Sequence, residues 1–268
     1  MTDPQNPYEA PSSDLVVDQD FVDGSLRDIP RKLAAGRGLA WIGEAWGYFK
    51  QSPLNWILMF LILVALMFLL SLIPFLGPLV TNLIMPALLA GFMLSCRDLD
   101  GGKKFPVERL FGAFSLPQRN RFFILGWLYI GATLGIVLLI MLIMLLGFGI
   151  SGMQAGFGDA PAPEDFMGSG GPATLLAILI AMLLIIPVLM AFYFAPALIL
   201  FHDLDVVSAL KRSFTGCLRN ILPFLLFGIA MFFLSILAMI PLMLGFLVLS
   251  PIAMITIYVA YREIFLEA

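Results

Sequence analysis

The chain consists mainly of long apolar runs separated by short polar segments. A membrane-spanning helix needs about 20 apolar residues, because each adds about 1.5 Å against a hydrocarbon core of about 30 Å. The run over residues 55–96 is interrupted by Pro74, Gly77 and Pro78, which favour a turn between two helices. The run over residues 221–261 is interrupted in the same way around Pro241 and Gly245. The pattern predicts six spans, at residues 55–75, 79–96, 122–147, 173–201, 221–241 and 246–261.

A shorter motif recurs just before each odd-numbered span and reads Phe, five residues, Asn. Its copies are Phe49 to Asn55, Phe114 to Asn120 and Phe214 to Asn220. Each copy follows apolar residues at the spacing of a helix with one apolar face; in the first copy these are Leu39, Ile42 and Trp46. We therefore expect three amphipathic helices on the membrane surface. Each Asn is expected to cap the N-terminus of the spanning helix that follows it.

A second motif recurs after each even-numbered span. Its copies are Arg97-Asp98-Leu99-Asp100, His202-Asp203-Leu204-Asp205 and, more loosely, Arg262-Glu263-Ile264-Phe265. Together the motifs predict an all-α membrane protein of three tandem units, each a cytoplasmic interfacial helix followed by a transmembrane hairpin. Units that all insert the same way up imply a pseudo-threefold axis along the membrane normal.

Composition and charge give the orientation. Apolar residues make up 61% of the 268 residues and charged residues only 12%, which is far more apolar than an ordinary soluble domain. All 15 basic residues lie before span one, between spans two and three, between spans four and five, or after span six. Because Lys and Arg are retained on the cytoplasmic side, both termini are expected in the cytoplasm. The net charge of −3 excludes the basic excess of a nucleic-acid-binding protein.

The change in composition near residue 35 divides the chain in two. Residues 1–35 are rich in acidic side chains and contain no continuous apolar run, so we expect a disordered cytoplasmic tail and no signal peptide. Residues 36–268 are expected to form the six-helix transmembrane domain. Within the tail, the segment from Asn6 to Pro11 is a candidate motif for a membrane or cytoplasmic protein partner, and a merely solvated tail is the alternative.

Candidate binding residues are the aromatic and basic side chains at the expected cytoplasmic interface. Amphipathic rings favour the headgroup layer, and each well-placed Lys or Arg adds about 1 kcal/mol of attraction to anionic lipids. A structural aromatic belt without specific lipid contact is the alternative. The candidates for headgroup contact are Trp41, Trp46, Lys50, Lys103, Lys104, Arg121, Lys211, Arg212 and Arg219.

The sequence provides no candidate catalytic residue and predicts no cofactor or metal. The predicted spans contain no Asp, Glu, Lys, Arg or His, which disfavours a proton- or ion-coupled pump. A nucleophile paired with a His base has only His202 to draw on. The carboxylates of Asp98, Asp100, Asp203 and Asp205 would suit a hard cation, but we interpret Asp100 and Asp205 as the start of the helices that follow.

Two glycine patterns are interpreted as structural. Gly147, Gly149 and Gly152 have the spacing of a dinucleotide-binding loop, but they end a predicted membrane helix and do not follow a strand. Gly131 and Gly135 are four residues apart, which allows another helix to approach closely. We expect that approach to take place within the monomer.

Two stretches carry a resemblance to a known group of proteins. They are Gly38-Leu-Ala-Trp41 through Trp46-Gly-Tyr-Phe49, and Phe194-Ala-Pro-Ala-Leu-Ile-Leu-Phe201 through Ser208 to Phe224. Residues 35–268 resemble an uncharacterised family of proteobacterial six-span inner-membrane proteins, which is distantly similar to the membrane domain of glycerophosphodiester phosphodiesterases. The resemblance implies a bacterial inner-membrane location. It implies no catalysis, because the Glu, Asp and His cluster of those enzymes belongs to a separate soluble barrel.

These observations predict a non-enzymatic inner-membrane protein that acts as a scaffold for lipids or for a partner protein. The alternative is a small uncoupled transporter or channel for a lipid or a small apolar solute. An interior filled by side chains favours the scaffold, and an open path favours the transporter.

Overall fold

The computed structural model describes residues 24–155 and 171–267. Within these residues, six segments are long and apolar enough to cross a membrane, in agreement with the six predicted spans. These segments are Pro53–Ser71, Leu76–Asp100, Arg119–Leu146, Leu175–His202, Ile221–Met239 and Phe246–Phe265.

The order of short and long helices repeats three times along the described chain. The first unit comprises α1 (Arg37–Gln51), α2 (Pro53–Ser71) and α3 (Leu76–Asp100). The second comprises the 3-10 helix η2 (Val107–Ser115), then α4 (Arg119–Ala155), α6 (Gly171–Tyr193) and α7 (Ala195–His202). The third comprises α8 (Val206–Arg219), α9 (Ile221–Met239) and α10 (Phe246–Phe265). The three predicted surface helices are therefore present as α1, η2 and α8.

Helix boundaries differ from the predicted spans where proline acts differently from expectation. Helix α3 begins before Pro78, because a proline in the first helical turn removes no hydrogen bond that the helix needs. The predicted span 173–201 is broken at Phe194, just before Pro196. There the N–H of Phe194 donates to Ser213 Oγ at 2.9 Å. The helix ladder is thus replaced by a bond to α8.

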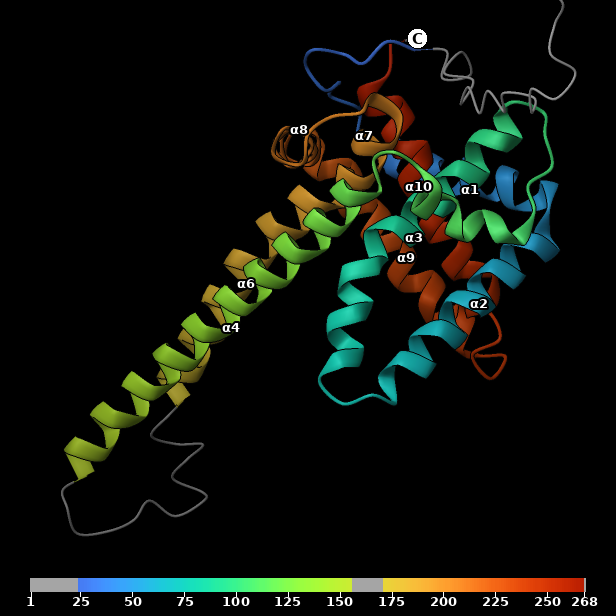
Figure 1. The fold of residues 1–268 in the computed structure, drawn as a ribbon. Helices are drawn as coiled ribbons and strands as arrows, with labels where there is room; N and C mark the ends of the chain where they lie inside the picture. Colours follow the sequence, from blue (N-terminus) through green and yellow to red (C-terminus); the bar gives the residue numbers. More distant parts are fainter. Residues whose placement is uncertain (1–23, 156–170, 268) are drawn as a thin grey trace, which may run out of the picture.

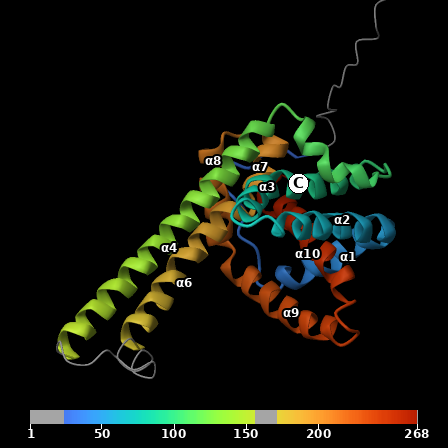
Figure 2. The same ribbon diagram turned by 60° about the horizontal axis from the view of Figure 1, so that its bottom comes forward.

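Helix α4 is longer than predicted. It continues through Gly147, Gly149 and Gly152 to Ala155, so these glycines lie inside a helix and do not end it. Figures 1 and 2 show α4 and α6 side by side, projecting as a pair away from the other helices. Many large apolar side chains of this pair are exposed, as expected for a surface that faces lipid.

The packed core lies near the end of the molecule that carries both ends of the described chain, which we call the terminal end. Large side chains of α2, α3, α7 and α10 fill it, among them Trp56, Phe92, Leu198 and Tyr261. Toward the opposite end, α2, α9, α4 and α6 are mostly exposed. The helices are therefore held together at one end and separate toward the other (Figure 1).

Part of the predicted acidic tail packs at the terminal end. The N–H groups of Arg27 and Arg31 donate to the carbonyls of Phe265 and Ile264, each at 2.8 Å. Leu26 also forms an isolated bridge with Leu266. Residues 24–35 thus run along the end of α10, while the candidate partner motif at residues 6–11 lies outside the described residues.

Each short helix packs mainly on the hairpin of another unit. Helix α1 contacts α9 and α10, η2 contacts α2 and α3, and α8 contacts α6 and α7. Ion pairs accompany two of these contacts. Asp98 at the end of α3 pairs with Arg109 of η2, and Glu263 at the end of α10 pairs with Arg37 of α1. The units therefore interlock with one another.

The two hairpin tips opposite the terminal end are apolar. No charged or polar side chain lies between Ser71 and Thr81, or between Ser235 and Ser250. Phe75 and Leu242 are 94% and 89% exposed, and both have positive φ angles, of 62° and 51°. Most tip N–H groups bond to carbonyls of the same turn, as in Gly77 N–H to Ile73 O at 2.9 Å.

Candidate functional site

A hydrogen-bonded network around Asp100 joins α1, α3 and α10 at the terminal end. The hydroxyls of Tyr48 and Tyr258 donate to the Asp100 carboxylate at 2.5 and 2.6 Å. Arg262 Nη1 donates to the same carboxylate at 2.7 Å and to Tyr48 Oη at 2.8 Å. Burial, together with the neighbouring carboxylate, raises the pKa of Tyr48 well above its ordinary value. Tyr48 is therefore a neutral donor at physiological pH.

Replacing Asp100 by alanine is expected to lower the free energy of unfolding by about 2 kcal/mol, because two hydroxyls and a guanidinium lose their acceptor in a partly buried site. Tyr258→Phe should cost about 1 kcal/mol, since it removes a single neutral donor. Thermal unfolding in detergent measures both values. Equal stability of Asp100→Ala and the wild type would show that the network does not hold α1, α3 and α10 together.

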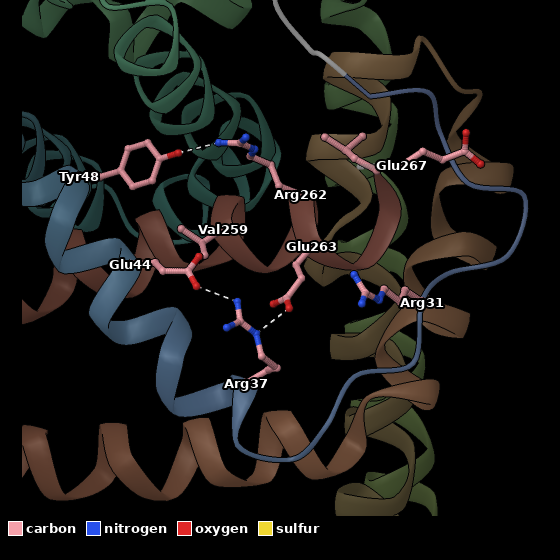
Figure 3. Close-up of a pocket in the computed structure, with 9 residues that line it drawn as sticks. Arg31, Arg37, Glu44, Tyr48, Val259, Arg262, Glu263 and Glu267 are labelled. Atoms are coloured by element: carbon pink, nitrogen blue, oxygen red, sulfur yellow. Dashed lines mark hydrogen bonds and ion pairs between the residues drawn. The ribbon is translucent and has the colours of Figure 1, made fainter.

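A polar cavity of about 320 Å³ lies beside this network, between α1, α10 and residues 24–36. Figure 3 shows Arg37 reaching Glu44 and Glu263 from within it. The bonds are 2.6 Å from Arg37 Nε to Glu263 Oε1 and 2.7 Å from Arg37 Nη2 to Glu44 Oε1. Its charged lining residues are Arg31, Arg37, Arg262, Glu44, Glu263 and Glu267.

The charges of this cavity are balanced. Three arginines face three glutamates, and the bond to Glu263 is the main reason that the pKa of Arg37 is raised. Trp41 Nε1 donates to the second oxygen of Glu263 at 2.6 Å. The cavity therefore presents no excess of either charge to an ionic ligand, and its carboxylates pin α1 to α10.

The headgroup candidates divide into exposed and engaged side chains. Trp41 is fully buried, because its ring packs on Phe224 and Phe227 and its N–H is bonded, so it offers no surface to a headgroup. Arg121 donates to Asp203 and Leu204, and Arg212 donates to the carbonyl of Arg27. The exposed candidates are Trp46, Lys50, Lys103, Lys104, Lys211 and Arg219.

The predicted capping role of the repeated asparagines is wrong. Asn220 makes no side-chain capping bond to α9; it accepts from the N–H of Leu33 and donates to the carbonyls of Arg31 and Gly216, each at 2.9 Å. Asn55 likewise donates to the carbonyl of Phe105, ahead of η2. These side chains tie a hairpin to the segment that precedes another unit's short helix, because that backbone has unpaired groups to satisfy.

The other members of the repeated motif behave differently from one another. Asn120 is exposed, and its neighbour Arg121 makes the bonds to the segment before α8. The rings of Phe49, Phe114 and Phe214 are buried or half-buried.

The two Asp-Leu-Asp motifs differ in use. Asp205 caps α8 as predicted, accepting from the N–H of Ser208 at 3.0 Å, and this bond lowers its pKa. Asp100 does not start a helix; it is the last residue of α3, and its carboxylate holds the tyrosine network. His202 lies against Tyr261, with Nε2 and Oη 2.5 Å apart.

An apolar groove of about 380 Å³ lies between α6, α8 and α9. The sequence pattern does not predict it, because its walls come from three segments and its residues look like ordinary core or lipid-facing positions. The signal that points to it is the break in the fourth span before Pro196. Its lining residues are Ile186, Leu189, Met190, Tyr193, Cys217, Ile221, Phe224 and Leu225.

The six spans and the three surface helices define an all-α integral membrane protein. A protein of Burkholderia thailandensis, named as a probable inner membrane protein, is 31% identical over 210 residues, which cover 76% of this chain and 76% of that protein. The chain belongs to the same family of inner membrane proteins. No protein-family model matches the chain, and no solved structure matches it. The expected distant similarity to glycerophosphodiester phosphodiesterases gains no support from these comparisons and stays a prediction.

Proposed function

We propose that this protein is a non-enzymatic inner-membrane scaffold whose short helices bind anionic lipid headgroups at the cytoplasmic face. The observation that carries the proposal is the pairing of exposed apolar and exposed basic side chains on these helices. Helix α1 exposes Trp46 beside Lys50, and α8 exposes Leu218 beside Arg219. Such helices bury their apolar side chains at the boundary between headgroups and acyl chains while their cations meet phosphate.

The distribution of charge supports the proposed orientation. All 15 basic residues belong to segments at the terminal end or to the last turns of helices that finish there. Because basic residues are retained on the cytoplasmic side, both termini are cytoplasmic in this proposal.

The proposal includes a ring of three equivalent units. Its support is the cyclic pattern of contacts, in which each short helix packs on the hairpin of the preceding unit and α1 packs on the last. The bond from Asn55 to the segment before η2 and the bonds from Asn220 to the segment before α1 follow the same cycle. Arg121 takes the corresponding place in the second unit.

A filled interior favours the scaffold over an uncoupled channel. Within the described residues, the space where α2, α3, α7 and α10 meet is occupied by fully buried rings, including Trp56, Phe92 and Phe194. Trp56 stacks on Phe92 with ring centres 6.0 Å apart. A continuous solute path through this region would require these rings to move.

The headgroup proposal is tested by native mass spectrometry of the full chain released from nanodiscs of mixed phosphatidylglycerol and phosphatidylcholine. We expect a preference for phosphatidylglycerol that weakens as salt rises. Substituting Lys50, Lys211 and Arg219 together by Gln should reduce this preference, by about fivefold for each cation that lies near phosphate. The matched control keeps the charges, with Lys50→Arg, Lys211→Arg and Arg219→Lys, and should bind like the wild type.

Two outcomes contradict the proposal. One is a phosphatidylglycerol preference that is the same in the Gln variant and the control. The other concerns orientation: a Lys104→Cys variant in sealed inner-membrane vesicles of known sidedness should react with an impermeant maleimide from the cytoplasmic side. Labelling from the opposite side would reject the cytoplasmic placement of the short helices.

A further inference from the structure

The groove between α6, α8 and α9 takes no part in the headgroup contacts proposed above. Helices α6 and α9 diverge from the region of α8, as Figure 2 shows, and the groove lies between them. Ile186 on α6 and Leu225 on α9 line it and are 52% and 55% exposed. Both belong to membrane-spanning segments, so the surrounding medium is hydrocarbon and the groove opens toward acyl chains.

The floor of the groove is aromatic and shaped by the break between α6 and α7. Tyr193 packs edge to face on Phe224, with ring centres 5.4 Å apart. Because Phe194 donates its N–H to Ser213, the carbonyl of Met190 accepts instead from Ser213 Oγ at 2.7 Å and from Cys217 Sγ at 3.5 Å. The backbone groups at the break are thereby satisfied within the protein. Burial raises the pKa of the Cys217 thiol to about 12, so this thiol stays neutral.

One polar group in the groove lacks a partner among the residues that the structure describes. The hydroxyl of Tyr193 makes no hydrogen bond within this part of the chain. A hydroxyl in an apolar site, away from water, is costly unless an acceptor reaches it. The carbonyl of Met190 is already taken, and the other lining side chains are apolar apart from the Cys217 thiol. An occupant that carries its own acceptor would satisfy this hydroxyl.

Charge at the polar end of the groove selects the occupant further. Arg219 is exposed and lies in the chain between two lining residues, Cys217 and Ile221. Among the described residues, no acidic side chain lines the groove. An occupant with a hydrocarbon chain, a carbonyl acceptor below it and a negative group at the surface matches all three features. A diacyl phospholipid has this order of groups.

We propose that the groove holds one phospholipid, with an acyl chain between α6 and α9, an ester carbonyl that accepts from Tyr193 Oη, and the phosphate near Arg219. The inference rests on the membrane placement of the proposed function and deepens it, because it adds a retained lipid to the exchangeable headgroup contacts. A volume of about 380 Å³ lies in the range of about 300–1,000 Å³ that is usual for small-molecule sites.

The test is native mass spectrometry of the full chain from nanodiscs that contain phosphatidylglycerol, at low and at high salt. We expect one phosphatidylglycerol per chain to remain at high salt, when exchangeable headgroup contacts are lost. Leu225→Trp fills the groove and should reduce the fraction of chains with retained lipid at least about tenfold, as expected when two methylene groups lose their site. Leu237→Trp is the matched control, since it places the same ring on an exposed position of α9 outside the groove and should retain lipid normally.

Tyr193→Phe keeps the aromatic packing and removes only the hydroxyl, so it remains informative if Leu225→Trp fails to fold. It should reduce retention about fivefold, the factor typical of one neutral hydrogen bond. Equal retention in Leu225→Trp, Tyr193→Phe and Leu237→Trp would overturn the proposal, as would a free fatty acid, a second copy of the chain or another protein bound in the groove. If retained lipid is absent but the salt-dependent preference persists, the groove proposal fails alone; the reverse result rejects the headgroup proposal alone.

Discussion

Gly38→Ala is expected to destabilise the protein by more than about 4 kcal/mol, or to prevent folding. A Cβ atom at this position would overlap the carbonyl oxygen of Pro223 and lie 3.1 Å from the backbone nitrogen of Phe227. These are backbone atoms of α9, which cannot turn aside as a side chain can. Helix α1 would have to move away from α9, and the buried packing of Trp41 on Phe224 would be lost.

The same helix supplies the control. A Cβ atom at Gly43 would have no neighbouring atom within 4 Å, so Gly43→Ala meets open space and should stabilise α1 by about 1 kcal/mol through helix propensity. Thermal unfolding of the purified variants in one detergent compares them directly. If both variants unfolded at the same temperature, α1 would not lie against the backbone of α9.

Asn220→Ala should lower the free energy of unfolding by about 3 kcal/mol, because three hydrogen bonds to backbone groups are lost inside the protein. The side chain is fully buried and joins Leu33, Arg31 and Gly216. Its removal leaves two carbonyls and one N–H without this partner and frees residues 31–33 from α9. Denaturant or thermal unfolding, followed by tryptophan fluorescence, measures the loss.

Asn120→Ala is the matched control from the same repeated motif. Asn120 is exposed, so its replacement should change stability by no more than about 0.5 kcal/mol. Limited proteolysis adds a second reading, since Asn220→Ala should expose the chain near Arg31 and Asn120→Ala should not. Equal losses in the two variants would mean that the motif has the same role in each copy, contrary to the contacts described above.

The spans and the surface helices could be predicted because both depend on local patterns. A long apolar run interrupted at Pro74 and Gly77 specifies two helices and a turn whatever lies around them. The periodic apolar residues before Asn55 specify a short helix in the same way. Positions such as Pro78 shift a boundary by a few residues without changing the number of spans.

The site could not be predicted, because its contacts join distant segments. The partners of Asn220 are 187 and 189 residues away in the chain, and a capping rule considers only the next turn of helix. The apolar pattern places Trp41 at the membrane surface, but the buried face of α1 consists of Gly38, Trp41, Ala45 and Phe49. This face lies beside the predicted one, and both are apolar.

The apolar hairpin tips also bear on how the protein enters the membrane. Neither the turn around Phe75 nor the turn around Leu242 contains a charged side chain, and most of their N–H groups already bond within the turn. Carrying a single Lys or Arg to the centre of the bilayer costs about 2.5–3.5 kcal/mol, and these turns avoid that cost during translocation. Each of these hairpins can therefore partition into the bilayer as a preassembled pair of helices, and the membrane potential has no formal charge on either turn to pull across.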